Sequence, residues 1–155
     1  MRDHDRVTPE LNALKSALDS LRAGVLKKLA GLGEEEARRS TVSSGTNLAG
    51  IVQHLTFVES KWFEGVVAGG TPSRGNRSMQ VDPSVSLRAL RVEYKAACDA
   101  SNAIIASIGD AAAPIVLDNK PSDLRTVMLI AINETARHAG HADIIREQID
   151  GRVGR

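Results

Sequence analysis

The 155-residue sequence has few aromatic side chains, a single cysteine and almost no net charge. Aromatic residues make up 3% of the chain, so a stacking platform for nucleic-acid bases is not expected. One cysteine excludes both a disulfide framework and an all-cysteine zinc cluster. The 20 Lys and Arg residues are balanced by 19 Asp and Glu, whereas dedicated nucleic-acid binders carry a basic excess or a basic stripe.

Long apolar runs are also missing. No stretch of 18 apolar residues occurs, and the first residues lack the apolar centre of a signal peptide. We therefore expect a cytoplasmic protein without membrane or nucleic-acid partners. We further expect one domain over residues 1–155, with a flexible tail at 1–7, because a chain of this length can bury roughly 68–70% of its unfolded surface in one core.

Helical periodicity is what the sequence does contain. Four stretches carry apolar residues every three or four positions, and joints rich in Gly, Pro or Ser separate them. Four amphipathic helices with two long connections predict an all-α fold of the four-helix-bundle class. The predicted helices cover residues 9–30, 47–68, 84–108 and about 122–151, with a short polar helix near 34–37, a surface loop at 69–83 and a weak strand candidate at 115–117.

The last predicted helix carries ionisable residues on its apolar side. Glu134, His138 and His141 fall within roughly 60° of one another on a helical surface. Core residues of the same helix, such as Val127 and Ile145, project in nearly the same direction. Buried polar groups without partners cost on the order of 2–7 kcal/mol each. A divalent cation would satisfy all three, because imidazole nitrogens and carboxylate oxygens are its usual ligands.

A metal held by one helix would be weakly bound, so a second helix should contribute. His54 lies at the edge of the apolar stripe of the second predicted helix. Three protein ligands with an open position are typical of catalytic sites, in which the metal activates water or a thiol. Two ordinary explanations stay open: a single inward histidine is more often a hydrogen-bonded core residue, and Glu-x-x-x-His is often a helical ion pair.

Several segments resemble a known family. Residues 134–151, ETARHAGHADIIREQIDG, are similar to the C-terminal signature of the DinB/YfiT-like superfamily. GIVQHL at 50–55, ESKWF at 59–63, LNALK at 11–15 and LGEEE at 32–36 resemble, more narrowly, an actinobacterial branch related to mycothiol-dependent enzymes. The resemblance covers nearly the whole chain.

The resemblance implies a four-helix bundle that binds a divalent metal, often zinc or nickel, through His54, Glu134 and His138. His141 would be a further ligand or would support the ligands from outside. Relatives often carry histidine at the position of Ile130, so a drier pocket or a weaker activity is expected here. Relatives are often dimers, which makes a homodimer one expected assembly.

The implied function is a thiol-dependent transferase or isomerase that uses a thiol such as mycothiol on a small electrophile. A non-catalytic metal-binding module of stress response or interaction, and a metal-dependent hydrolase, are the alternatives. Arg137 is a weak candidate for gripping a thiol cofactor, as are Arg125 and Arg146, but a solvated outer face explains all three better. Cys98 has no basic neighbour in the sequence, so we expect it to be structural.

Overall fold

The computed structural model describes residues 7–75 and 78–154, and these residues are predominantly helical. The predicted tail at 1–7 lies outside this part of the chain except for Val7. The described elements are α1 (Pro9–Lys27), α2 (Glu34–Arg38), α3 (Leu48–Glu59), the π-helix η2 (Ser60–Val67), α4 (Leu87–Ile108), β1 (Pro114–Leu117), β2 (Lys120–Asp123) and α5 (Leu124–Asp150).

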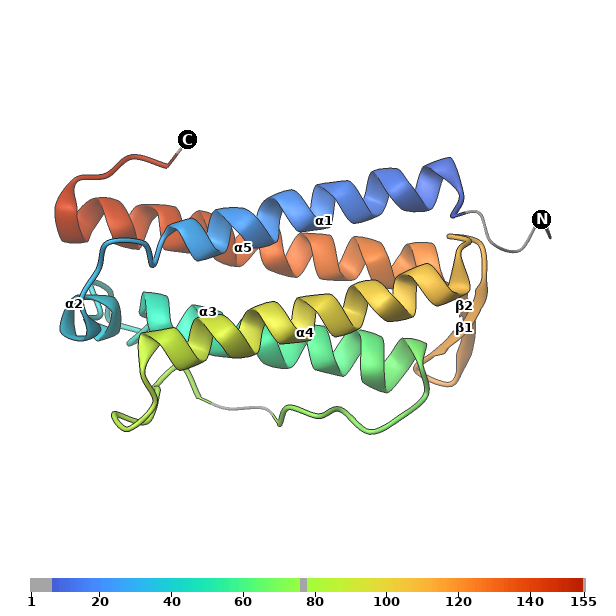
Figure 1. Ribbon diagram of the computed structural model, residues 1–155, viewed down its shortest axis with the longest axis horizontal. Coiled ribbons are helices and arrows are strands. Elements are labelled where there is room, and N and C mark those ends of the chain that lie inside the picture. The colour runs from blue at the N-terminus through green and yellow to red at the C-terminus, as the bar shows by residue number, and fades with distance from the viewer. Residues whose placement is uncertain (1–6, 76–77, 155) are drawn as a thin grey trace.

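The long helices lie side by side in two pairs (Figure 1). Helix α1 packs mainly on α5, and α3 packs mainly on α4 and also against α5. The short α2 lies at one end of the molecule, and the two strands lie at the other end (Figure 1). None of the described helices combines the length and apolar character that crossing a membrane requires.

Side-chain caps fix where these helices begin. Thr8, Asn47, Ser86 and Asp123 each accept a hydrogen bond from the backbone N–H three residues further on. The third long helix therefore starts at Leu87, three residues later than the periodicity predicts. The strand candidate is a hairpin, in which β1 and β2 pair antiparallel across two residues with positive φ, as a tight primed turn requires.

The second predicted helix is not one continuous α-helix. The α-helical hydrogen bonding ends at Glu59, and the chain continues as the π-helix η2, with the Ala68 N–H donating to the Phe63 carbonyl five residues back. The Ser60 hydroxyl donates to the Glu64 carboxylate at 2.6 Å, and that carboxylate also accepts from the backbone N–H of Ser73. These contacts tie the wide turn to the chain that follows it.

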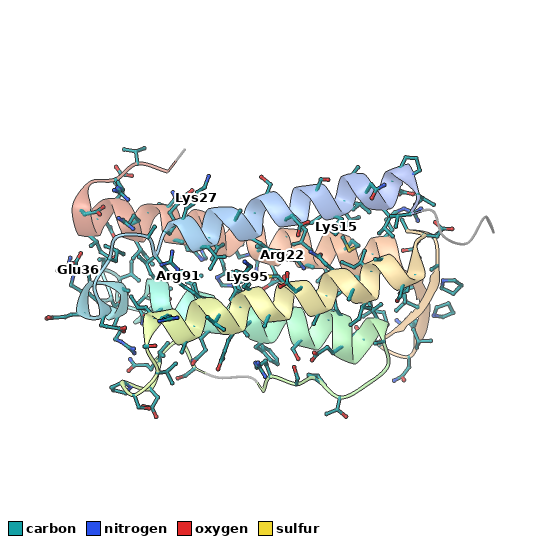
Figure 2. All side chains as sticks on the ribbon, viewed as in Figure 1. Lys15, Arg22, Lys27, Glu36, Arg91 and Lys95 are labelled. Atoms are coloured by element: carbon teal, nitrogen blue, oxygen red, sulfur yellow. The ribbon has the colours of Figure 1, made fainter. Side chains whose placement is uncertain are left out.

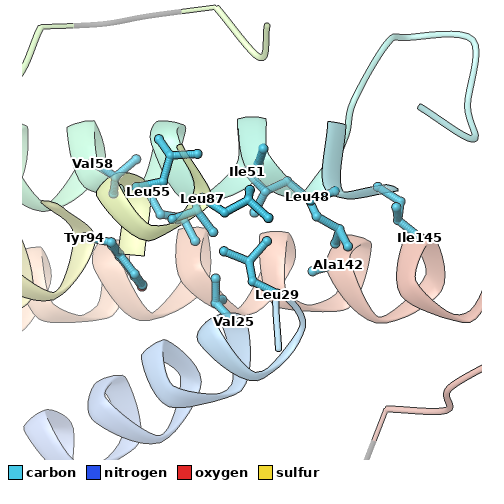
Figure 3. Close-up of a cluster of buried hydrophobic side chains, with 14 of the residues drawn as sticks. Val25, Leu29, Leu48, Ile51, Leu55, Val58, Leu87, Tyr94, Ala142 and Ile145 are labelled. Carbon is cyan, nitrogen blue, oxygen red and sulfur yellow. The ribbon is translucent and has the colours of Figure 1, made fainter. Parts of the chain in front are cut away.

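The hydrophobic core of the described residues consists of two clusters. One is formed by residues from α1, α2, α3, α4 and α5, and ten of its side chains are labelled in Figure 3. The other lies nearer the hairpin and includes Phe63, Ile105 and Met128. The partly buried Trp62 packs against both clusters. Helix α4 buries six residues spaced three or four positions apart: Leu87, Leu90, Tyr94, Cys98, Ser101 and Ile105.

A buried ion pair interrupts this apolar interior. Arg22 on α1 lies between the ribbons of α1 and α4 (Figure 2) and donates two parallel hydrogen bonds, of 2.7 and 2.6 Å, to the Glu59 carboxylate. Its third nitrogen donates to Asp19 and to Asn102, both at 2.8 Å. Such two-pronged pairing is the strongest geometry for an arginine and a carboxylate. It joins α1 to the point where α3 becomes η2.

The connection between η2 and α4 lies against α3. Asn47 and Gln53 donate side-chain hydrogen bonds to the carbonyls of Met79 and Ser78, at 3.2 and 2.8 Å. A Cβ atom at Gly50 would overlap the Met79 carbonyl, so this close approach requires glycine at that position. Most described residues of the predicted surface loop are exposed, but Met79 packs on the first core cluster.

Candidate metal centre

Three ionisable side chains meet where α3 faces α5. His54 comes from α3, and Glu134 and His138 come from successive turns of α5. One potential ligand atom from each residue lies within 4.8 Å of the other two. The Glu134 Oε2 atom is 3.9 Å from His54 Nε2 and 3.8 Å from His138 Nε2. Metal binding by these three residues stays a prediction.

The donors suit a divalent cation. Two imidazole nitrogens and one carboxylate oxygen form a common ligand set for zinc and related metals. The Nε2 atom of His138 lies 3.8 Å from the Glu134 carboxylate, and the buried Nδ1 atom of the same ring has no hydrogen-bond partner among the described residues. The three side chains are between 12% and 27% exposed, which leaves the group open to solvent on one side.

The electrostatic environment keeps both imidazoles neutral. Burial, followed by the neighbouring His54, lowers the pKa of His138 to about 4. Burial also lowers the pKa of His54, although the Glu134 carboxylate acts in the opposite direction. Neutral imidazole is the form that binds metals, so both rings are ready to donate a nitrogen at neutral pH.

Helical spacing predicted His141 on the inward face of the helix, and its exposure contradicts that position. Its role as a further ligand or as an outer support of the ligands stays a prediction. His141 is absent from the group of atoms that lie within 4.8 Å of one another. Its ring centre lies 5.5 Å from that of His138. His141 lines a surface pocket together with Val42, Ser44 and Thr46 of the chain before α3. Helical periodicity shows which residues share a face, but it does not show which residues at the edge of that face are covered by other segments.

Of the three arginines considered, Arg137 and Arg125 lie at the surface. Arg137 donates to Glu134 at 3.3 Å and so helps to orient that carboxylate. Arg125 pairs with Glu10 and Asp123.

Arg146 contradicts the prediction of an outer-face role. Its side chain is buried and donates to the backbone carbonyls of Lys28 and Ala30, at 2.9 and 2.7 Å, and to Asp150. These carbonyls lie at the end of α1, where helices leave acceptors unpaired. Periodicity could not reveal this role because the partners lie more than 100 residues away in the chain.

Phe57 is a neighbour of the site that the sequence interpretation missed. Its partly exposed ring lies 6.4 Å from the His54 ring, measured between centroids. The three-residue spacing from His54 on α3 was the available signal, because residues three apart are neighbours on a helix. Phe57 adds an apolar surface beside the candidate ligands.

Cys98 is expected to be chemically inert in the folded protein. It is buried, and burial, with the negative charge of Glu59, raises its pKa to about 12. Since the thiolate is the reactive form, iodoacetamide at pH 8 should alkylate the folded protein far more slowly than the urea-unfolded protein. Mass spectrometry measures both rates. Equal rates would show that Cys98 is accessible, and a loss of metal content or activity in Cys98→Ala would give it a role at the site.

Comparison with known proteins adds one finding to this geometry. No curated protein matches the sequence. The family model described as mycothiol-S-transferase matches residues 13–151, a range that includes all three residues of the candidate centre. The match agrees with the resemblance seen in the sequence motifs. The chain therefore belongs to the mycothiol-S-transferase family.

Proposed function

We propose that the protein binds a divalent metal through His54, Glu134 and His138 and transfers a thiol to a small electrophile. The observation that carries the proposal is the approach of these three side chains to within 4.8 Å. The family match supports mycothiol as the thiol. Zinc is the proposed metal, with nickel as an alternative, because nitrogen and carboxylate ligands suit both.

The protein groups prepare the site in three ways. The two neutral imidazoles offer nitrogen lone pairs, Arg137 holds the Glu134 carboxylate, and the exposed side leaves room for a thiol to approach. A bound divalent cation would lower the pKa of a coordinated thiol and so supply a thiolate at neutral pH. In the transfer, the thiol sulfur bonds to the electrophilic carbon, the leaving group departs with its electron pair, and the thiol proton passes to solvent.

The wider architecture belongs to the same proposal. We propose one domain with the DinB/YfiT-like four-helix-bundle fold, supported by the four long helical segments that lie side by side (Figure 1). A homodimer and a cytoplasmic location are proposed from the family resemblance. A metal-dependent hydrolase is the second candidate, because the solvent-exposed side of the three residues is equally open to water.

The test is a thiol-conjugation assay on zinc-loaded protein with mycothiol and 1-chloro-2,4-dinitrobenzene. We expect thiol-dependent formation of the thioether, and we expect His138→Ala to reduce the rate to that of the uncatalysed reaction. The exposed variant Val92→Ala is the control and should keep the wild-type rate, since Val92 lies on α4 and outside the candidate centre.

The other outcomes contradict the transferase proposal in different ways. Zinc-dependent ester or amide hydrolysis without thioether formation would favour the hydrolase. Zinc binding without either reaction would indicate a non-catalytic metal-binding module. A rate that His138→Ala leaves unchanged would remove the candidate centre from the chemistry.

A further inference from the structure

A surface pocket adjoins the candidate metal centre. It has a volume of about 290 Å³ and is lined by Val42, Ser44, Thr46, His141, Ile144 and Ile145. Three of these residues precede α3, and the other three lie on α5. The pocket therefore forms where the α2–α3 connection crosses the last helix. Figure 3 shows Ile145 of α5 at the edge of the first core cluster.

His141 links the pocket to the candidate centre. Its side chain is part of the pocket wall, and its ring centre is 5.5 Å from that of His138. The His138 ring centre is in turn 4.7 Å from that of His54. His141 is therefore a neighbour of both the pocket and the candidate ligand His138.

The lining selects for an uncharged, mostly apolar occupant. Val42, Ile144 and Ile145 supply branched aliphatic surface, while Ser44 and Thr46 supply hydroxyls. None of the six lining residues carries a carboxylate, an ammonium or a guanidinium group. A charged ligand would lose hydration on entry without meeting an opposite charge, whereas an apolar ligand would gain by burial.

Two lining residues are large aliphatic side chains that stay exposed. Val42 is 41% exposed and Ile144 is 58% exposed. An apolar ligand would cover both side chains. An engineered apolar cavity of about 150 Å³ takes up benzene, so the larger volume here has room for a substituted ring or a short alkyl chain.

From this geometry we infer that the pocket holds the body of the electrophile and that the substrates are small uncharged electrophiles with an aryl or short alkyl group. This inference rests on the proposed function. For an aryl or alkyl halide, the carbon–sulfur bond forms and the carbon–halogen bond breaks. The halide leaves with the bonding pair and the thiol proton passes to solvent, so no oxidant or reductant is needed.

The test uses two unreactive probes on the full-length protein, benzyl alcohol and glucose. Titrations are followed by ¹⁵N NMR, with metal-free and with zinc-loaded protein. Benzyl alcohol should cause saturable shifts at the backbone amides of residues 42–46 and 141–145, and glucose should cause none. Both probes are uncharged and carry hydroxyls, so a difference between them reports the apolar character of the site.

A pair of matched variants locates the binding. Val42→Trp should fill the pocket and weaken benzyl alcohol binding by about tenfold, which corresponds to about 1.4 kcal/mol. Val92→Trp places the same side chain at an exposed position of α4 that does not line the pocket, and it should bind as the wild type does. Amide spectra report whether each variant is folded, and the comparison of the two probes on the wild type stands without either variant.

The outcomes separate this inference from the proposed function. The inference would be overturned if benzyl alcohol caused no shifts at residues 42–46 and 141–145, or if glucose caused saturable shifts at these residues. Either result would count against it even if the protein binds zinc and conjugates thiols. Equal weakening by both tryptophan variants would also overturn it. Loss of zinc binding and of thioether formation with intact probe binding would instead overturn the proposed function.

Discussion

Glu59→Ala is expected to destabilise the protein by about 3 kcal/mol, the lower end of the range of about 3–5 kcal/mol for breaking a buried ion pair. Arg22 and Glu59 are only 4% and 2% exposed, so the substitution leaves a guanidinium charge in the interior without its main partner. The lower end applies because Arg22 keeps its hydrogen bonds to Asp19 and Asn102. Urea unfolding followed by circular dichroism measures the change in free energy.

A surface pair provides the matched control for Glu59→Ala. Glu10 pairs with Arg125, and both side chains are more than a third exposed. Exposed pairs contribute little because water already solvates both charges and salt screens them. Glu10→Ala should therefore change the unfolding free energy much less than Glu59→Ala. Similar losses in the two variants would contradict the interior role of the Arg22–Glu59 pair.

A second comparison separates the charge from the packing. Arg22→Met combined with Glu59→Ala removes both charges, so the double variant should be more stable than Glu59→Ala alone. If the double variant loses as much stability relative to the wild type as Arg22→Met and Glu59→Ala lose together, the two residues act independently and the proposed coupling is wrong.

His138→Ala is expected to weaken zinc binding by more than about 100-fold. Loss of a residue that only supports a metal ligand weakens binding by about 10–100-fold, and loss of a ligand itself should cost more. The substitution removes one of three proposed ligands, and His138 is the most buried of them at 12% exposure. Isothermal titration of chelator-treated protein with zinc measures the change. The folded state is checked by circular dichroism, since the His138 side chain is largely buried.

His141→Ala is the informative control, because it removes a histidine from the same helix. His141 is exposed and lies outside the group of three candidate ligands. We therefore expect the zinc affinity of His141→Ala to stay close to that of the wild type. A loss as large as that of His138→Ala would make His141 a ligand and would contradict the proposed three-residue centre.

The sequence predicted those features that depend on local spacing. Apolar residues at every third or fourth position predicted a helix over residues 84–108, because a helix repeats every 3.6 residues, and α4 lies within this range. The same periodicity placed His54 and His138 near the faces that α3 and α5 turn toward each other. The predominantly helical class followed from four such stretches, and the short hairpin was visible only as a weak strand signal.

Features that depend on distant partners could not be predicted. Glu59 and Arg22 are 37 residues apart, and Arg146 finds its carbonyl partners 116 and 118 residues away. The π-helix at Ser60–Val67 was not predicted either. The apolar residues around it fit an α-helical period closely enough to suggest one continuous helix. His141 was misplaced because its exposure depends on how the α2–α3 connection crosses α5.

The most direct measurement of the central claim is anomalous diffraction at the zinc absorption edge from crystals of the zinc-loaded protein. Our account predicts a peak bounded by His54, Glu134 and His138, with His141 outside the coordination sphere. No peak between α3 and α5, or a peak coordinated by other side chains, would contradict it.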